Sequence, residues 1–252
     1  MKLHTKTTGK GEPLVLLHGG MGSMNHWHRN VHALAQHYTV HALDMPSYGE
    51  SPTVPKDMPR DEFVGHVIEG LNATVPTGAF RLAGFSFGGM VAAACAAHMG
   101  TRIHKLSLLG PGGFERPTVE LSMKKIPPES AGVAAIRAAL RHNLEVMMCA
   151  GPGKVSDETV DLHLYNVQRT RYDGRRISLF AGLMSSYLKA MTCPVQFIWG
   201  GQDVLAEPLQ ARIDEVRATM PGVRTHVIPE AGHWVQYDAP DETHRLLLDF
   251  MQ

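Results

Sequence analysis

The feature that most constrains this chain is the pentapeptide at 84–88, which reads Gly-Phe-Ser-Phe-Gly. An apolar run typical of a buried strand precedes it, and a run of small residues with helical character follows at 90–97. A strand that passes through Gly-x-Ser-x-Gly straight into a helix holds its serine in a sharp, strained turn above the end of the sheet. The glycines are needed because the two backbones approach too closely there for a Cβ atom. The pattern predicts that Ser86 is a nucleophile.

Gly-x-Ser-x-Gly also arises by chance in glycine-rich loops, so the prediction depends on partners elsewhere in the chain. Strands are expected at 13–17, 38–43, 80–83, 105–109, 194–199 and 223–228, and helices at 27–36, 58–75, 90–99, 206–219 and 241–251. This alternation predicts an α/β fold with a mostly parallel central sheet and helices on both faces. In such a fold, ligands gather at the carboxyl ends of the strands.

The alternating pattern breaks after residue 113. Buried strand runs vanish, and helical periodicity takes their place at 131–148 and 157–168. Breaks between these helices are expected at Pro117, Pro127, Pro128 and 151–153. We therefore predict a core domain made of 1–113 and 190–252, with residues 114–189, called the cap segment below, inserted as a helical lid.

Two further side chains suit a serine nucleophile. Asp203 lies on the loop just past the strand 194–199, where a carboxylate keeps part of its solvation, and His233 lies on the loop after 223–228 at the same sheet edge. Serine's hydroxyl is a poor nucleophile at its free pKa, so a base must accept its proton, and an acid must orient that base. We predict the triad Ser86, His233 and Asp203.

The loop after the first buried strand, His18-Gly19-Gly20-Met21-Gly22, is rich in glycine. Its backbone N–H groups can approach a ligand closely, as an oxyanion hole requires. We expect the oxyanion donors to be the N–H groups of Gly20 and Phe87, with Met21 as the fallback donor. His18 is expected to hold the loop through side-chain hydrogen bonds rather than to act as a catalytic base.

At this point the sequence resembles the α/β-hydrolase family. The order Ser86, Asp203, His233 is the family's order of nucleophile, acid and histidine. The matching stretches span the whole predicted core: 17–20, 44–46 with Gly49 and Ser51, 84–89, 199–200 with Asp203, and 232–234. Dehalogenases and epoxide hydrolases of this fold carry aspartate at the nucleophile position, so Ser86 argues against those activities.

Within the family, the chain resembles lid-bearing hydrolases of small molecules, which include esterases and the carbon–carbon hydrolases of aromatic ring-fission products. Stretches 86–89, 109–113 and 232–236 are similar to the carbon–carbon hydrolases, whereas the loop 20–23 lacks their typical proline. Their lid arginine, which binds a substrate carboxylate, falls at His163. The resemblance implies substrate contacts from Met21, Trp234 and His163. We also expect Arg169 or Arg171 to point inward.

Composition excludes several other functions. Lys+Arg and Asp+Glu both number 24, so no basic surplus favours nucleic acid. The sequence has no signal-peptide pattern and no run long enough to span a membrane, and its three scattered cysteines fit reduced thiols. We therefore expect a cytoplasmic protein with a small-molecule substrate and neither a nucleic-acid nor a membrane partner, and a homodimer is left open.

Metal and cofactor chemistry is not expected either. His26 and His32 stand near His28, but no cysteine or carboxylate cluster joins them, and a triad needs neither a metal nor an organic cofactor. The leading interpretation is a serine hydrolase of a small carboxylic ester or related acyl compound. A carbon–carbon hydrolase of a dienoate, a non-catalytic ligand-binding module on the same fold and an acyl transferase remain as alternatives.

Overall fold

The computed structural model describes residues 1–115 and 119–252. Pro117, one of the expected helix breaks, lies outside the described residues. Within these described ranges, seven strands form one sheet in the order β1-β3-β2-β4-β5-β6-β7. They are β1 (Thr5–Thr8), β2 (Pro13–Leu17), β3 (Thr39–Leu43), β4 (Phe80–Phe85), β5 (Ile103–Leu109), β6 (Val195–Gly200) and β7 (Arg224–Ile228).

The sheet is parallel except at one edge. β1 pairs antiparallel with β3, and every other neighbouring pair is parallel. The strands from β2 to β7 therefore end at one edge of the sheet, where the loops that follow them lie together. This arrangement confirms the predicted α/β fold class.

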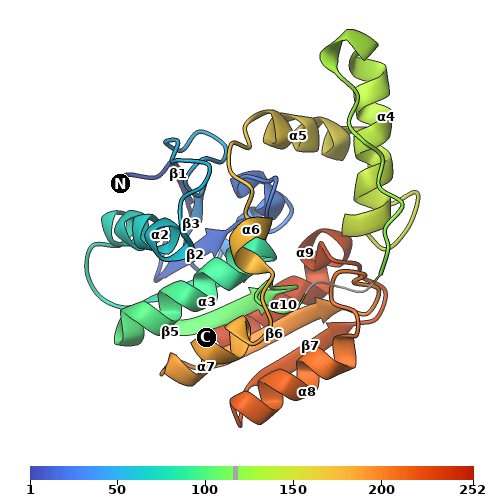
Figure 1. The fold of residues 1–252 in the computed structure, drawn as a ribbon. Coiled ribbons are helices and arrows are strands. Elements are labelled where there is room, and N and C mark those ends of the chain that lie inside the picture. The colour runs from blue at the N-terminus through green and yellow to red at the C-terminus, as the bar shows by residue number, and fades with distance from the viewer. Residues whose placement is uncertain (116–118) are drawn as a thin grey trace.

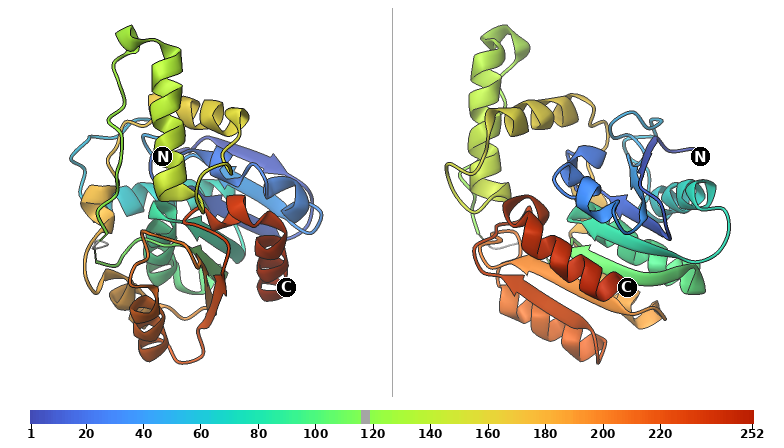
Figure 2. Two further views of the ribbon diagram at one scale, coloured as in Figure 1. Left: turned by 90° about the vertical axis from the view of Figure 1, so that its right-hand side faces the viewer. Right: turned by 180° about the vertical axis from the view of Figure 1, so that it is seen from behind.

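Helices cover both faces of the sheet. Leu14 and Leu16 of β2 face one apolar core, while Val15 and Leu17 face the other, because side chains alternate along a strand. One face packs against α2 (Arg60–Thr74), α3 (Phe87–Met99), α7 (Leu183–Ala190) and α8 (Leu209–Thr219), which lie in front of the sheet in Figure 1. The view from behind in Figure 2 shows α10 (Pro240–Met251) on the opposite face.

The cap segment holds most of the remaining helices. It contains a short 3₁₀ turn (Glu129–Ala131), α4 (Val133–Asn143), a π-helical turn (Leu144–Met148), α5 (Asp157–Gln168) and α6 (Arg175–Ser178). α4 and α5 stand outside the layered core, and both views of Figure 2 show α4 projecting from it. α7 begins within 114–189 and packs against α3 and α8 of the core.

Two expected helices differ from the structure. The helix predicted at 27–36 is replaced by a 3₁₀ turn (Met24–Trp27) and a single turn, α1 (Val31–Leu34). Buried Asn30 separates them, because its side-chain amide donates to the carbonyl of Gln236 in α9 (Val235–Asp238) at 3.0 Å. The helix predicted at 131–148 changes to π-helical geometry at Leu144, where the N–H of Cys149 donates to the Leu144 carbonyl at 2.9 Å.

Among the described residues, no helix combines the length and apolar character that a bilayer crossing requires.

Candidate active site

Ser86 lies at the turn between β4 and α3. Its backbone has φ 53° and ψ −117°, an unfavourable conformation for a residue with a Cβ atom. A Cβ atom at Gly84 would lie 2.4 Å from the carbonyl oxygen of Gly88, and one at Gly88 would lie 2.2 Å from that of His18. Both glycines are thus required by close backbone approach, and together they leave the serine at the exposed point of the turn.

A hydrogen-bonded chain joins Ser86 to two other loops. Nε2 of His233 lies 2.8 Å from Oγ of Ser86, and Nδ1 of His233 lies 3.0 Å from each carboxylate oxygen of Asp203. His233 is 4% exposed and Asp203 is 2% exposed. Because an ionised carboxylate only accepts hydrogen bonds, the Nδ1 atom carries the proton and Nε2 is free to accept from the serine hydroxyl. The arrangement can remove a proton from Ser86.

The loops after three neighbouring strands set this geometry. Asp203 follows β6, and its Oδ1 atom accepts the N–H of Leu205 at 2.9 Å. Gly110 follows β5 with φ +46°, and a Cβ atom there would lie 3.2 Å from both Oδ2 of Asp203 and Nδ1 of His233. A side chain at position 110 would therefore press against both the acid and the imidazole.

The glycine-rich loop after β2 packs beside the serine. A Cβ atom on Gly19 would lie 3.2 Å from Cβ of Ser86. His18 is fully buried: its Nδ1 atom lies 2.7 Å from the Gly19 carbonyl oxygen, and its Nε2 atom accepts the N–H of Met45 at 3.0 Å. Burial lowers the pKa of His18, which keeps the imidazole neutral and able to accept. His18 thus holds the loop through its side-chain bonds.

The two residues expected to donate to an oxyanion lie next to each other. A Cβ atom at Gly20 would lie 3.8 Å from Cβ of Phe87, which is the first residue of α3. The N–H of Phe87 belongs to the first turn of that helix, where backbone donors have no partner within the helix. Met21 follows with φ 52° and is 40% exposed. Gly20 therefore lies against the residue that directly follows Ser86.

Three residues predicted to contact the substrate bond to other parts of the protein in this structure. Trp234 is fully buried, with its ring N–H donating to the His26 carbonyl at 2.9 Å and its ring stacked on Tyr237. The guanidinium of Arg169 bonds Glu50 at 2.8 Å on the surface. Arg171 is also exposed and donates to the carbonyl of Arg169. The partners of Trp234 and Arg169 lie far away in the sequence, where periodicity cannot reveal them.

Surface contacts also engage four more arginines among the described residues of the cap segment. Arg137 and Arg141 bond Asp157 at the start of α5, and Arg175 bonds Asp173. Arg176 donates to the carbonyl of Lys56. These pairs are solvated, so they leave the arginines engaged at the surface rather than directed at the serine.

His163, the remaining predicted contact, lies in a buried polar cluster between α5 and the loop after β2. It is 5% exposed, and burial lowers its pKa to about 4, so the ring is neutral near pH 7. Asn166, one turn further along α5, accepts a hydrogen bond from Ser23 at 2.7 Å. His26 accepts the N–H of Gly19 at 3.1 Å. Sequence reasoning missed Ser23 and Asn166, which carry no local signal.

The three histidines considered as metal ligands serve different contacts. His26 is buried and bonded to Gly19, the ring of His28 lies against Trp234 and Tyr237, and His32 is exposed on α1. Across residues 1–115 and 119–252, no group of three or more His, Cys, Asp or Glu side chains is placed to hold a metal ion.

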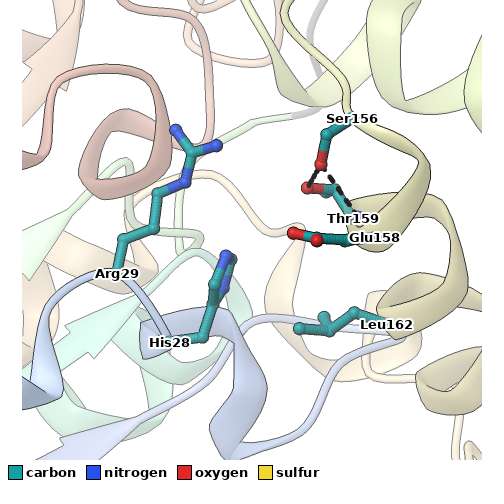
Figure 3. A pocket seen from close by; sticks show the side chains of 6 residues that line it. All are labelled: His28, Arg29, Ser156, Glu158, Thr159 and Leu162. Atoms are coloured by element: carbon teal, nitrogen blue, oxygen red, sulfur yellow. Dashed lines mark hydrogen bonds between the residues drawn. The ribbon is translucent and has the colours of Figure 1, made fainter.

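A cavity of about 310 Å³ lies between the cap segment and the core. It is lined by His28, Arg29, Ser156, Glu158, Thr159 and Leu162. Figure 3 shows the side chains of His28 and Arg29 on one side and those from the start of α5 on the other. No triad residue is among those that line it, so this cavity is separate from the hydrogen-bonded chain at Ser86.

Comparison with known proteins supports this fold. The model of the alpha/beta hydrolase family matches residues 14–246. A 2-hydroxy-6-oxononadienedioate/2-hydroxy-6-oxononatrienedioate hydrolase from Burkholderia vietnamiensis is 30% identical, with all of this chain and 91% of that protein covered. The chain therefore belongs to the α/β-hydrolase family, and it is a hydrolase.

Two solved structures share the fold. A meta-cleavage product hydrolase from Pseudomonas fluorescens IP01 superposes with a TM-score of 0.77 at 22% identity, covering 98% of this chain and 93% of that one. A carboxylesterase from Bacillus subtilis gives a TM-score of 0.72 at 17% identity, covering 98% and 87%. At such identities the likeness extends to the fold alone.

Proposed function

We propose that the protein is a serine hydrolase that cleaves a small carboxylic ester or related acyl compound. The observation that carries this proposal is the hydrogen-bonded chain from Ser86 through His233 to Asp203. In this role His233 accepts the hydroxyl proton of Ser86 as its oxygen attacks the substrate carbonyl, and later returns the proton to the leaving alcohol. Asp203 fixes the tautomer and stabilises the imidazolium.

The developing negative charge needs donors that are already in place. We assign this role to the N–H groups of Phe87 and Gly20, with Met21 as the fallback. The start of α3 adds a favourable dipole at Phe87. Attack by Ser86 releases the alcohol and leaves an acyl-enzyme, which water then hydrolyses with His233 acting again as base. This sequence of steps requires neither a metal nor an organic cofactor.

The placement of the cationic side chains supports a neutral substrate. Arg169 is paired with Glu50, Arg171 is exposed, and His163 is buried with its pKa lowered to about 4. A substrate carboxylate in a buried site would require a cationic partner. We propose that the cap segment forms a lid over Ser86 and selects substrates by shape and by neutral hydrogen bonds.

Carbon–carbon cleavage of a dienoate is the second candidate. The relative from Burkholderia vietnamiensis supports it, because that protein is named for a dienedioate and is 30% identical along the whole chain. His163 is the side chain that this candidate needs most, since it takes the place of a lid arginine. A cytoplasmic location is proposed with either function, and the buried free thiols of Cys95, Cys149 and Cys193 support it.

The first test is labelling by a fluorophosphonate, which reacts with an activated serine. Wild-type protein should be labelled at Ser86, and Ser86→Ala should not be labelled. Absence of labelling in a folded wild-type protein would favour the ligand-binding module. Transfer of the acyl group to an added alcohol faster than to water would instead favour the acyl transferase.

A substrate panel then separates the two hydrolytic candidates. Wild type and His163→Ala are compared on nitrophenyl esters of increasing acyl length and on a dienoate with a free carboxylate. Turnover of the esters without the dienoate supports the esterase. Turnover of the dienoate that His163→Ala selectively abolishes would establish the carbon–carbon hydrolase. Arg171→Ala, which removes an exposed guanidinium from the same segment, is the matched control.

A further inference from the structure

One oxygen of Asp238 connects two backbone segments that are far apart in the sequence. Its Oδ2 atom accepts the N–H of Gly232 and the N–H of Ala150, each at 2.8 Å. Gly232 directly precedes His233, and Ala150 belongs to the cap segment. Asp238 lies in α9, one turn beyond the histidine loop. A single carboxylate oxygen therefore bonds the cap segment and the loop of the triad histidine at once.

The cap segment and the loop of His233 also contact each other at Trp234, which directly follows the histidine. The N–H of Trp234 donates to the carbonyl of Met148 at 2.6 Å. A Cβ atom on Gly232 would lie only 2.6 Å from the carbonyl carbon of Cys149, so the two backbones are in direct contact. Both neighbours of His233 are thus tied to residues 148–150, one directly and one through Asp238.

Residues 148–150 lie between two irregular stretches of the cap segment. The π-helical turn Leu144–Met148 ends α4, and such turns are frequent at functional sites. Gly151 and Gly153 follow with φ +91° and +86°, conformations that lead the chain into a sharp turn. If α4 moved relative to the core, residues 148–150 would move with it and would shift the loop of His233 that they contact.

We propose that Asp238 is a positioning residue that fastens the cap segment to the loop of His233. His233 is then held at hydrogen-bond distance from Ser86 while residues 148–150 are docked. The consequence for catalysis rests on the proposed function, whereas the fastening itself does not. Loss of the carboxylate would leave two backbone N–H groups without their acceptor, and a small shift of His233 would slow proton transfer.

The test compares four variants with the wild type. Asp238→Ala removes the acceptor, Asp238→Asn keeps an acceptor oxygen without the charge, and Ala150→Pro removes the donor on the cap side alone. Cys149, which would precede the new proline, has φ −109° and ψ 162°, the region preferred before proline. Asp241→Asn is the matched control, since it removes an exposed carboxylate three residues further on.

Two experiments are compared. The first measures amide hydrogen exchange by mass spectrometry, and the second measures the maximal rate and half-saturating concentration of Ser86 labelling by a small fluorophosphonate. Asp238→Ala should raise exchange in both 144–151 and 230–235. It should also lower the maximal labelling rate about tenfold or more, with the half-saturating concentration within about twofold. Asp238→Asn should recover most of both effects. Ala150→Pro should raise exchange in 230–235, and Asp241→Asn should match the wild type.

Several results would overturn the proposal. Exchange that rises in only one of the two segments would show that Asp238 does not join them. A wild-type labelling rate in folded Asp238→Ala would mean that the residue stabilises the fold alone. If Asp238→Asn behaved like Asp238→Ala, the effect would come from loss of the negative charge and not from loss of the hydrogen-bond acceptor. If Asp238→Ala does not fold, Ala150→Pro decides, and unchanged exchange in 230–235 would overturn the proposal. If the wild type is not labelled at all, the proposed function is wrong. The exchange results would still show whether Asp238 joins the cap segment to the loop of His233.

Discussion

Nε2 of His233 lies 2.8 Å from Oγ of Ser86, although 147 residues separate the two in the sequence. Both residues follow strands of the parallel part of the sheet, β4 and β7, so the fold carries them to the same edge. The hydrogen bond has the length expected between an imidazole acceptor and a hydroxyl donor. The predictions below start from this contact.

Removal of either partner of this contact should abolish turnover. We expect Ser86→Ala and His233→Ala to lower kcat for a nitrophenyl ester by a similar factor, on the order of 10⁶, because neither residue can act without the other. The double variant should lose no more than either single variant. Circular dichroism and thermal melts serve as the control for folding. An additive loss in the double variant would contradict a shared role.

Asp203→Asn should be almost as severe. An amide that donates to Nδ1 would favour the wrong tautomer of His233, and the expected loss in kcat is on the order of 10⁴-fold with little change in KM. Steady-state kinetics on a neutral ester give this result. Near-normal activity of Asp203→Asn would mean that another carboxylate orients the histidine.

Gly110→Ala should damage the site more than the fold. A Cβ atom there would lie 3.2 Å from Oδ2 of Asp203 and from Nδ1 of His233. Gly182→Ala is the matched control, because Gly182 also has a positive φ, +68°, but its Cβ would meet no atom within 4 Å. Both variants should lose about 1–2 kcal/mol of unfolding free energy from the backbone conformation. Only Gly110→Ala should lose kcat, and an equal loss in both would contradict a steric effect at the triad.

His163 should make the stability of the protein depend on pH. Burial lowers its pKa to about 4, so in acid the unfolded chain binds a proton that the folded chain does not. The contribution of neutral His163 to the free energy of unfolding is therefore fully retained above the unfolded pKa of about 6.5. It is lost as the pH falls from there toward 4, by up to about 3 kcal/mol.

Urea unfolding of wild type and His163→Leu at several pH values between 4 and 7 measures this effect. The difference in unfolding free energy between the two proteins should change with pH over this interval, with the variant less sensitive to acid. Asn166→Leu is the control, since it removes another buried polar side chain of α5 that does not titrate in this range. The same pH dependence in wild type and His163→Leu would contradict the assignment.

Local sequence patterns were sufficient to predict most core elements and three residues, Ser86, His233 and Asp203, that the structure joins by hydrogen bonds. Runs of buried residues mark β2, β4, β5 and β6, and the glycines around Ser86 mark a turn whose close backbone approach excludes a Cβ atom on either side. These signals are local, because a strand's alternation and a turn's steric limits are contained within a few residues. The parallel order then follows from the alternation of strands and helices, since it brings the loops that carry Ser86, Asp203 and His233 to one edge.

The tertiary structure decided which other side chains reach the site. Trp234 is adjacent to His233 in the sequence but packs against Tyr237, and Arg169 turns outward to Glu50. Asn166 forms a hydrogen bond with Ser23, 143 positions away in the sequence, and Asp238 forms one with Ala150, 88 positions away. Such pairings depend on how the cap segment rests on the core. Their free energies come from contacts between distant segments, which leave no periodic trace along the chain.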